Sequence, residues 1–266
     1  MSTHKLTFVF IALFIFLIAW SIGLAAPLMD WLNPASEMER YLINKGVLTL
    51  VFAAVLWRMR LCAAVGFTSG TGLSTYVIGL PLIALGILAF FEPGRAALTA
   101  PEIAGWAVVV IFVAFTEETL FRGILWQALS ASNVWKRAFT TSFLFGLSHS
   151  IAAFGVFGWS MAGIYGLSAA GFGMVFAAMR ERAGTIWSVI IVHAVFDMAA
   201  ISASGGVDAL LEPELETYIG YALAATIFTA WGSGAIYLMQ RRARREQAPS
   251  ESANHGAQAA PSQQPS

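Results

Sequence analysis

Charged residues are scarce in this chain of 266 residues. Lys, Arg, Asp and Glu make up only 11% of it, whereas a soluble globular domain carries about 25%. Hydrophobic residues make up 58%, which indicates an integral membrane protein. Basic and acidic residues number 15 each, so the net charge is zero and no nucleic-acid partner is indicated.

Cysteine is almost missing as well, since Cys62 is the only one. An intramolecular disulfide is therefore excluded, and so is a metal site built from several cysteines. The apolar runs also lack the alternation of apolar and polar residues that a membrane β-barrel requires. Helices are the remaining way to satisfy the backbone inside lipid, so the sequence predicts an all-α, polytopic bundle of transmembrane helices.

Apolar runs near 20 residues long predict about eight transmembrane spans, because that length crosses the hydrocarbon core. The first run exceeds the apolar core of a signal peptide, so we expect it to be retained as a span. A basic stretch from residue 241 leads into a Gln, Ala, Ser and Pro-rich tail, residues 246–266, that we expect to be disordered. The spans cover about residues 6–26, 42–57, 75–92, 103–126, 138–156, 159–179, 185–203 and 217–239.

The distribution of Lys and Arg predicts the orientation, because basic residues concentrate on the cytoplasmic side. With the N-terminus inside, only Arg40, Lys45 and Arg95 fall outside, together with acidic loops within residues 30–39 and 208–216. Both termini are therefore predicted to be cytoplasmic. The basic residues on that side are Lys5, Arg58, Arg60, Lys136, Arg137, Arg180, Arg182, Arg241, Arg242, Arg244 and Arg245.

The segment Phe-Thr-Glu-Glu-Thr-Leu-Phe-Arg-Gly, residues 115–123, places three ionisable side chains inside a predicted span. Each charged group at a membrane centre costs about 2.5–3.5 kcal/mol on insertion scales. Glu118 and Arg122 are four residues apart on a helix and can pair. Glu117 points about 100° away and lacks that partner. A buried carboxylate without a cation is either protonated or held for a purpose, so Glu117 is the leading candidate for a functional role.

The other strong ionisable groups at membrane depth are His149, His193 and Asp197. With a rise of about 1.5 Å per residue, His193, Glu117 and His149 lie about 12, 14 and 18 Å from the cytoplasmic ends of their spans. Their similar depth predicts that they converge in the cytoplasmic half of the bundle.

Two further pairs have helical spacing. Asp197 follows His193 by one turn and can orient its imidazole, and Phe145 precedes His149 by one turn and can pack against it. Each group also has a structural explanation: the Glu118–Arg122 pair can simply lock helices together. Phe145 can likewise be simply an aromatic residue of the hydrophobic core.

These groups suit hydrolysis at a membrane-buried site. A carboxylate beside an imidazole can take a proton from water and pass it to a leaving amine, and a second imidazole can stabilise an oxyanion. Alternatively, Glu117, His149 and His193 can ligate a divalent metal such as zinc that holds a catalytic water. The sequence leaves the need for a metal open. It contains no His-Glu-x-x-His, Gly-x-Gly-Asp or Gly-x-Ser-Gly motif.

Three motifs in order resemble the CPBP family of CAAX-protease and bacteriocin-processing (Abi-type) intramembrane endopeptidases. Glu-Glu-x-x-x-Arg is matched by Glu117, Glu118 and Arg122, and Phe-x-x-x-His by Phe145 and His149. The third motif, His-x-x-x-Asn or Asp, is matched by residues 193 and 197. The resemblance covers about residues 103–203.

The resemblance implies an enzyme whose site opens toward the cytoplasm. It implies that Glu117, assisted by His149, activates water, and that His193 and residue 197 stabilise the oxyanion. Asp197 departs from the Asn of the prenyl-protein endopeptidases and cannot donate a hydrogen bond unless protonated, so it is expected to orient His193 instead. The implied substrates are membrane-associated or lipidated proteins or peptides that enter from the membrane or the cytoplasm.

Two other functions fit the same residues. Membrane Glu, His and Asp side chains relay protons in proton-coupled transporters, although these usually contain repeats and broken helices. A catalytically idle scaffold or immunity protein would use the charged groups only to hold helices together.

The chain is expected to be a multi-pass protein of the cell membrane with four regions. Residues 1–102 hold the N-terminal helices and linkers, and residues 103–203 form the catalytic core. Residues 204–240 form an outer loop and the last transmembrane helix, and residues 241–266 form the cytoplasmic tail.

Overall fold

The computed structural model describes residues 2–68, 70, 72–89, 91, 98–204 and 215–247, and all regular structure within them is helical. The predicted all-α bundle is therefore confirmed. In chain order the elements are α1 (Thr3–Ala19), η1 (Trp20–Leu24), α2 (Ala26–Leu32), α3 (Glu37–Arg58), α4 (Cys62–Val65), η2 (Leu73–Thr75), α5 (Tyr76–Ala89), α6 (Ala100–Glu118), η3 (Thr119–Leu125), α7 (Trp126–Ala128), α8 (Val134–Ala183), α9 (Trp187–Ser204) and α10 (Leu215–Gln247).

The helices match the predicted spans closely. Five in the described part are long and apolar enough to cross a membrane, and the segments 73–89 and 187–203 are shorter apolar helices. The predicted span 138–156 falls in the first part of α8. Eight spans and two cytoplasmic termini stay predictions. The five long segments are residues 3–24, 37–58, 100–128, 158–183 and 215–247.

The connection predicted to start at residue 27 is more helical than expected. α2 occupies its first part, and α3 begins at Glu37 rather than near residue 42. The reason is local, because the Ser36 hydroxyl accepts a hydrogen bond from the Glu39 amide at 3.1 Å. Two acidic residues in the first turn further favour a helix start there.

α8 is a helical hairpin rather than one straight rod. Gly158, with φ 75° and ψ −178°, breaks it between the predicted fifth and sixth spans. The two halves then pack so closely that a Cβ added at Gly166 would lie 2.7 Å from the Gly146 carbonyl oxygen. Small residues at this crossing, Gly146 and Gly166, therefore let the two helices approach closely.

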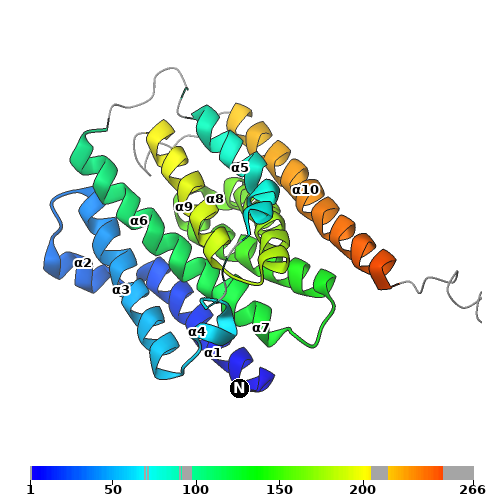
Figure 1. The fold of residues 1–266 in the computed structure, drawn as a ribbon. Coiled ribbons are helices and arrows are strands. Elements are labelled where there is room, and N and C mark those ends of the chain that lie inside the picture. Colours follow the sequence, from blue (N-terminus) through cyan, green and yellow to red (C-terminus); the bar gives the residue numbers. More distant parts are fainter. Residues whose placement is uncertain are drawn as a thin grey trace, which may run out of the picture.

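α6 runs between α3 and α9 (Figure 1). It packs against α3 on one side and α9 on the other, while α5 also packs on α9 and α10 packs on α8. α1 contacts η3, where Phe10 meets Phe121 edge to face at 6.3 Å. The end of α6 and the start of η3 are thereby enclosed by helices from both halves of the chain.

Some predicted features lie outside the described residues. These are the loop residue Arg95, most of the acidic loop with Asp208, Glu212 and Glu214, and the tail from residue 248 onward.

Candidate active site

The two adjacent glutamates sit where the central helix changes its winding. Glu117 and Glu118 end α6, and the π-helical segment η3 follows at once and carries Arg122. π-Helical turns inside longer helices occur frequently at functional sites.

Glu118 and Arg122 form the ion pair that their spacing predicts. Arg122 Nη1 lies 3.3 Å from Glu118 Oε1, and both side chains are fully buried. Arg122 also donates from Nη2 to the Gly173 carbonyl at 3.0 Å, and its guanidinium lies 4.5 Å from the centre of the Phe145 ring. The pair thus joins α6–η3 to both halves of α8.

Glu118 has a second partner that the sequence did not predict. Its Oε1 lies 2.8 Å from His193 Nδ1, on α9. Because Glu118 also accepts from Arg122, it acts as the acceptor and His193 Nδ1 carries the hydrogen. Glu118 therefore fixes the orientation of His193, a task that the spacing of His193 and Asp197 had assigned to Asp197 alone.

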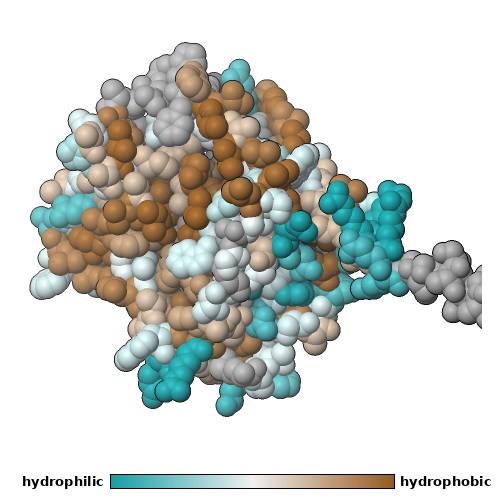
Figure 2. Space-filling view, viewed as in Figure 1, coloured by the Kyte–Doolittle hydropathy of each residue, from teal (hydrophilic) through white to brown (hydrophobic). Residues whose placement is uncertain are grey.

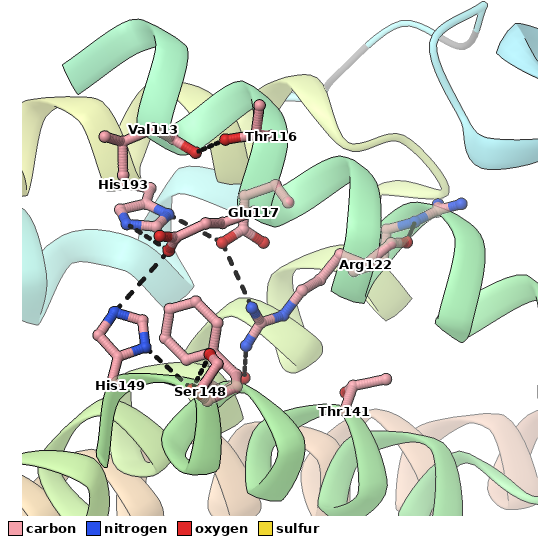
Figure 3. A network of polar contacts seen from close by, with 12 residues as sticks. Val113, Thr116, Glu117, Arg122, Thr141, Ser148, His149 and His193 are labelled. Carbon is pink, nitrogen blue, oxygen red and sulfur yellow. Dashed lines mark hydrogen bonds and ion pairs between the residues drawn. The ribbon is translucent and has the colours of Figure 1, made fainter. Parts of the chain in front are cut away.

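Glu117 lies between the two histidines (Figure 3). Its Oε2 is 3.8 Å from His149 Nε2 and 3.9 Å from His193 Nε2. This oxygen is buried and has no hydrogen-bond partner within the described residues. The structure therefore brings together the carboxylate and the two imidazoles whose similar depth was estimated from the sequence.

His149 is held so that one nitrogen faces Glu117. Its Nδ1 lies 2.9 Å from the Phe145 carbonyl oxygen, which can only accept, so Nδ1 carries the hydrogen. The Phe145 ring packs against the imidazole with centroids 4.4 Å apart. Nε2 of a neutral His149 is then an acceptor directed at the Glu117 carboxylate.

Asp197 approaches the other nitrogen of His193. Its Oδ2 is 3.4 Å from His193 Nε2, and 27% of its side chain is exposed. The imidazole of His193 thus has a carboxylate near each of its nitrogens.

Two aromatic residues of the site were missed by the sequence analysis. Phe176 stacks on His193 with centroids 5.0 Å apart, and Tyr165 lies 5.7 Å from the His149 ring. Both lie on the second half of α8, which has no ionisable motif. In the sequence these two residues differ from their neighbours only in being large aromatic side chains within a run of small residues, and no other feature indicates that they belong to the site.

Three side chains of the site are partly exposed. Glu117, His149 and Asp197 keep 14%, 20% and 27% of their side chains exposed, whereas Glu118 and Arg122 are sealed. Two acceptors 3.8 Å apart can share one water, because each hydrogen bond to it would span about 2.8 Å. The spacing of these two groups and their partial exposure are thus compatible with a water bound between Glu117 and His149.

A metal was the alternative use of the same residues. Among the described residues, no three His, Cys, Asp or Glu side chains are grouped so that they could hold a metal ion.

The comparisons with known proteins agree with the geometry. A family model described as type II CAAX prenyl endopeptidase, Rce1-like, matches residues 99–199, the segment that contains all seven residues of the three motifs. No curated protein matches the chain. Over residues 99–199 the chain is therefore similar to the Rce1-like type II CAAX prenyl endopeptidases, which agrees with the family that the three motifs indicated.

Proposed function

We propose that this protein is an intramembrane endopeptidase that hydrolyses peptide bonds of membrane-associated or lipidated proteins or peptides. The match of residues 99–199 to the Rce1-like family model supports a CAAX-type protease, and the helical bundle suits a membrane protein. The observation that carries the proposal is the placement of Glu117, whose Oε2 faces two imidazoles without a hydrogen-bond partner among the described residues.

Glu117 acts as the general base. A water bound between its carboxylate and His149 Nε2 gives a proton to Glu117 as its oxygen attacks the scissile carbonyl carbon. Glu117 returns this proton to the amide nitrogen, the C–N bond breaks, and a carboxylic acid and an amine leave. His149 holds the water, because its Nδ1 is committed to the Phe145 carbonyl and its Nε2 faces the site.

His193 stabilises the negative charge on the carbonyl oxygen. Its Nδ1 is committed to Glu118, and with both hydrogens present its Nε2–H points into the site. Asp197 orients this imidazole and balances its charge at 3.4 Å rather than donating to the oxyanion.

Glu118 and Arg122 support the site from behind. Both are fully buried, and the pair balances its own charge. Their part is to hold His193 in place, and because Arg122 is taken up by Glu118, Glu117 faces only the two imidazoles.

The test is a cleavage assay with the purified full chain in liposomes. Peptides with and without a C-terminal lipid anchor are offered to the wild-type protein, to His149→Ala and to His193→Ala, each with and without a chelator. We expect cleavage of anchored peptides, a loss of at least about 100-fold in both variants, and no effect of the chelator. Unchanged turnover in both variants would rule the mechanism out, and loss with chelator would shift it to a metal.

A further inference from the structure

A hollow away from the candidate active site lies where α10 passes α5 and the end of α8. Figure 2 shows apolar surface in this region with hydrophilic side chains on both sides of it. The hollow measures about 1260 Å³, which exceeds the roughly 300–1,000 Å³ of most small-molecule sites. We call it the basic groove, and its lining includes Val77, Ile78, Arg182, Trp231, Leu238 and Arg242.

The walls of the basic groove are apolar and uncovered. Val77 on α5 is 57% exposed, and Trp231 and Leu238 on α10 are 47% and 55% exposed. The Trp231 indole donates to the Ile78 carbonyl at 2.9 Å and so ties α10 to α5. Walls of this kind accept hydrocarbon rather than a hydrophilic solute.

Two guanidinium groups also line the groove. Arg182 comes from the end of α8 and Arg242 from α10, and neither forms an ion pair within the described residues. Arg182 makes one long hydrogen bond, 3.4 Å to the Ser74 hydroxyl. Guanidinium groups bind phosphate oxygens in pairs of parallel hydrogen bonds.

The acidic residues of the groove do not cancel this charge. Glu181 lines the groove but lies 3.8 Å from Arg137, which pairs with it. Glu246 is the other carboxylate of the lining. The lining holds two arginines and two glutamates. Because Glu181 pairs with Arg137, which lies outside the lining, Arg182 and Arg242 face only Glu246, and the one positive charge that remains matches a ligand with net negative charge.

We propose that the basic groove binds an anionic phospholipid. The phosphate lies between Arg182 and Arg242, and an acyl chain follows the apolar walls of α5 and α10. Basic pockets between transmembrane helices recognise lipid headgroups through this combination of charge and apolar surface. The site is independent of proteolysis, since it contains none of the three motifs.

The first test measures the midpoint of thermal unfolding of the full chain in a neutral detergent. The additives are phosphatidylglycerol, phosphatidylcholine and glycerol phosphate. We expect a saturable rise with phosphatidylglycerol, because a ligand that binds only the folded state stabilises it. A smaller rise is expected with phosphatidylcholine and none with glycerol phosphate, which lacks the acyl chains.

A matched pair of charge variants locates the headgroup. The double variant Arg182→Gln/Arg242→Gln removes the two groove arginines, and Arg241→Gln/Arg244→Gln removes two arginines that do not line it. Each basic residue near an anionic lipid contributes about 1 kcal/mol, so the first variant should need at least tenfold more phosphatidylglycerol for half of the rise. The second should behave like the wild type.

A matched pair of glycine variants locates the acyl chain. A Cβ added at Gly234, which lines the groove, or at Gly220, which lies elsewhere on α10, meets no atom within 4 Å. Gly234→Leu should therefore fold normally but fill the groove and abolish the rise, whereas Gly220→Leu should keep it.

Equal affinity for phosphatidylcholine, an equal loss in both charge variants, or an unchanged rise in Gly234→Leu would overturn the proposal. A rise with glycerol phosphate alone would assign the site to a free phosphate compound instead. The lipid site does not include Glu117, so Glu117→Gln should bind phosphatidylglycerol like the wild type. A failure of the proposed proteolysis would therefore not affect the outcome of the lipid-binding tests.

Discussion

Two neighbouring glutamates differ because of what surrounds each of them. Glu118 is fully buried, pairs with Arg122 and accepts a hydrogen bond from His193, so its charge is balanced within the protein. Glu117 is adjacent in sequence, yet its Oε2 has no hydrogen-bond partner among the described residues and faces Nε2 atoms. The two glutamates have the same side chain, and their different surroundings give Glu117 the role of the proposed base and Glu118 the role of positioning His193.

Removing only one partner of the Glu118–Arg122 ion pair should strongly destabilise the protein. Arg122→Met leaves Glu118 buried without its cation, so we expect a loss of about 3–5 kcal/mol in the free energy of unfolding. Unfolding in mixed detergent micelles measures it. The double variant Arg122→Met/Glu118→Gln serves as the control and should recover part of the loss. A single variant as stable as the wild type would show that the pair is not a structural unit.

Asp197 should act through His193 rather than on the substrate. Asp197→Ala removes the group that lies 3.4 Å from His193 Nε2, so we expect kcat to fall about 10–100-fold with little change in KM. Asp197→Asn keeps an acceptor oxygen and should lose less. If Asp197→Asn falls as far as Asp197→Ala, the negative charge matters more than the orientation.

The sequence predicted the meeting of Glu117, His149 and His193 because depth along a helix follows from residue number. It did not predict the hydrogen bond between Glu118 and His193, or the contacts of Phe176. Those depend on how each helix is rotated about its axis and on which helices are neighbours. Apolar runs that are hydrophobic all round carry little information on either.

At the scale of elements, helix ends were harder to predict than helix positions. α3 starts five residues before the predicted span because Ser36 caps it, and a cap of this kind works in polar sequence outside the apolar run. The π-helical winding of η3 also left no mark in the hydrophobic pattern. The hairpin of α8 was predicted as two spans, since the glycine at its break separates two apolar runs.

The break in α8 should require glycine. At φ 75° and ψ −178° a residue with a Cβ is strained by about 1–3 kcal/mol, so Gly158→Ala should be destabilised by that amount. Gly163→Ala is the matched control in the same helix, because a Cβ there also meets no atom within 4 Å. Its helical backbone favours Ala, so it should gain up to about 1 kcal/mol. Unfolding in mixed micelles compares the two, and equal stability of both variants would contradict the account of the hairpin.

At the scale of the whole molecule, the basic residues predict which side faces the cytoplasm. Cys62 is exposed and follows the basic end of α3, which we expect to be cytoplasmic. A maleimide that cannot cross membranes should therefore label Cys62 only after the cells are made permeable. Ala35→Cys in a Cys62→Ser background lies at the other end of α3 and should be labelled in intact cells. Labelling of Cys62 in intact cells would reverse the topology.

The measurement that bears most directly on the proposed mechanism is the turnover of Glu117→Gln beside its stability. The substitution keeps the shape of the side chain and removes the base, and no hydrogen bond to Oε2 is lost among the described residues. We expect kcat for a lipid-anchored peptide to fall by at least about 100-fold, with an unchanged midpoint of thermal unfolding. A folded Glu117→Gln protein that cleaves at the wild-type rate would contradict the assignment of Glu117 as the base that activates water.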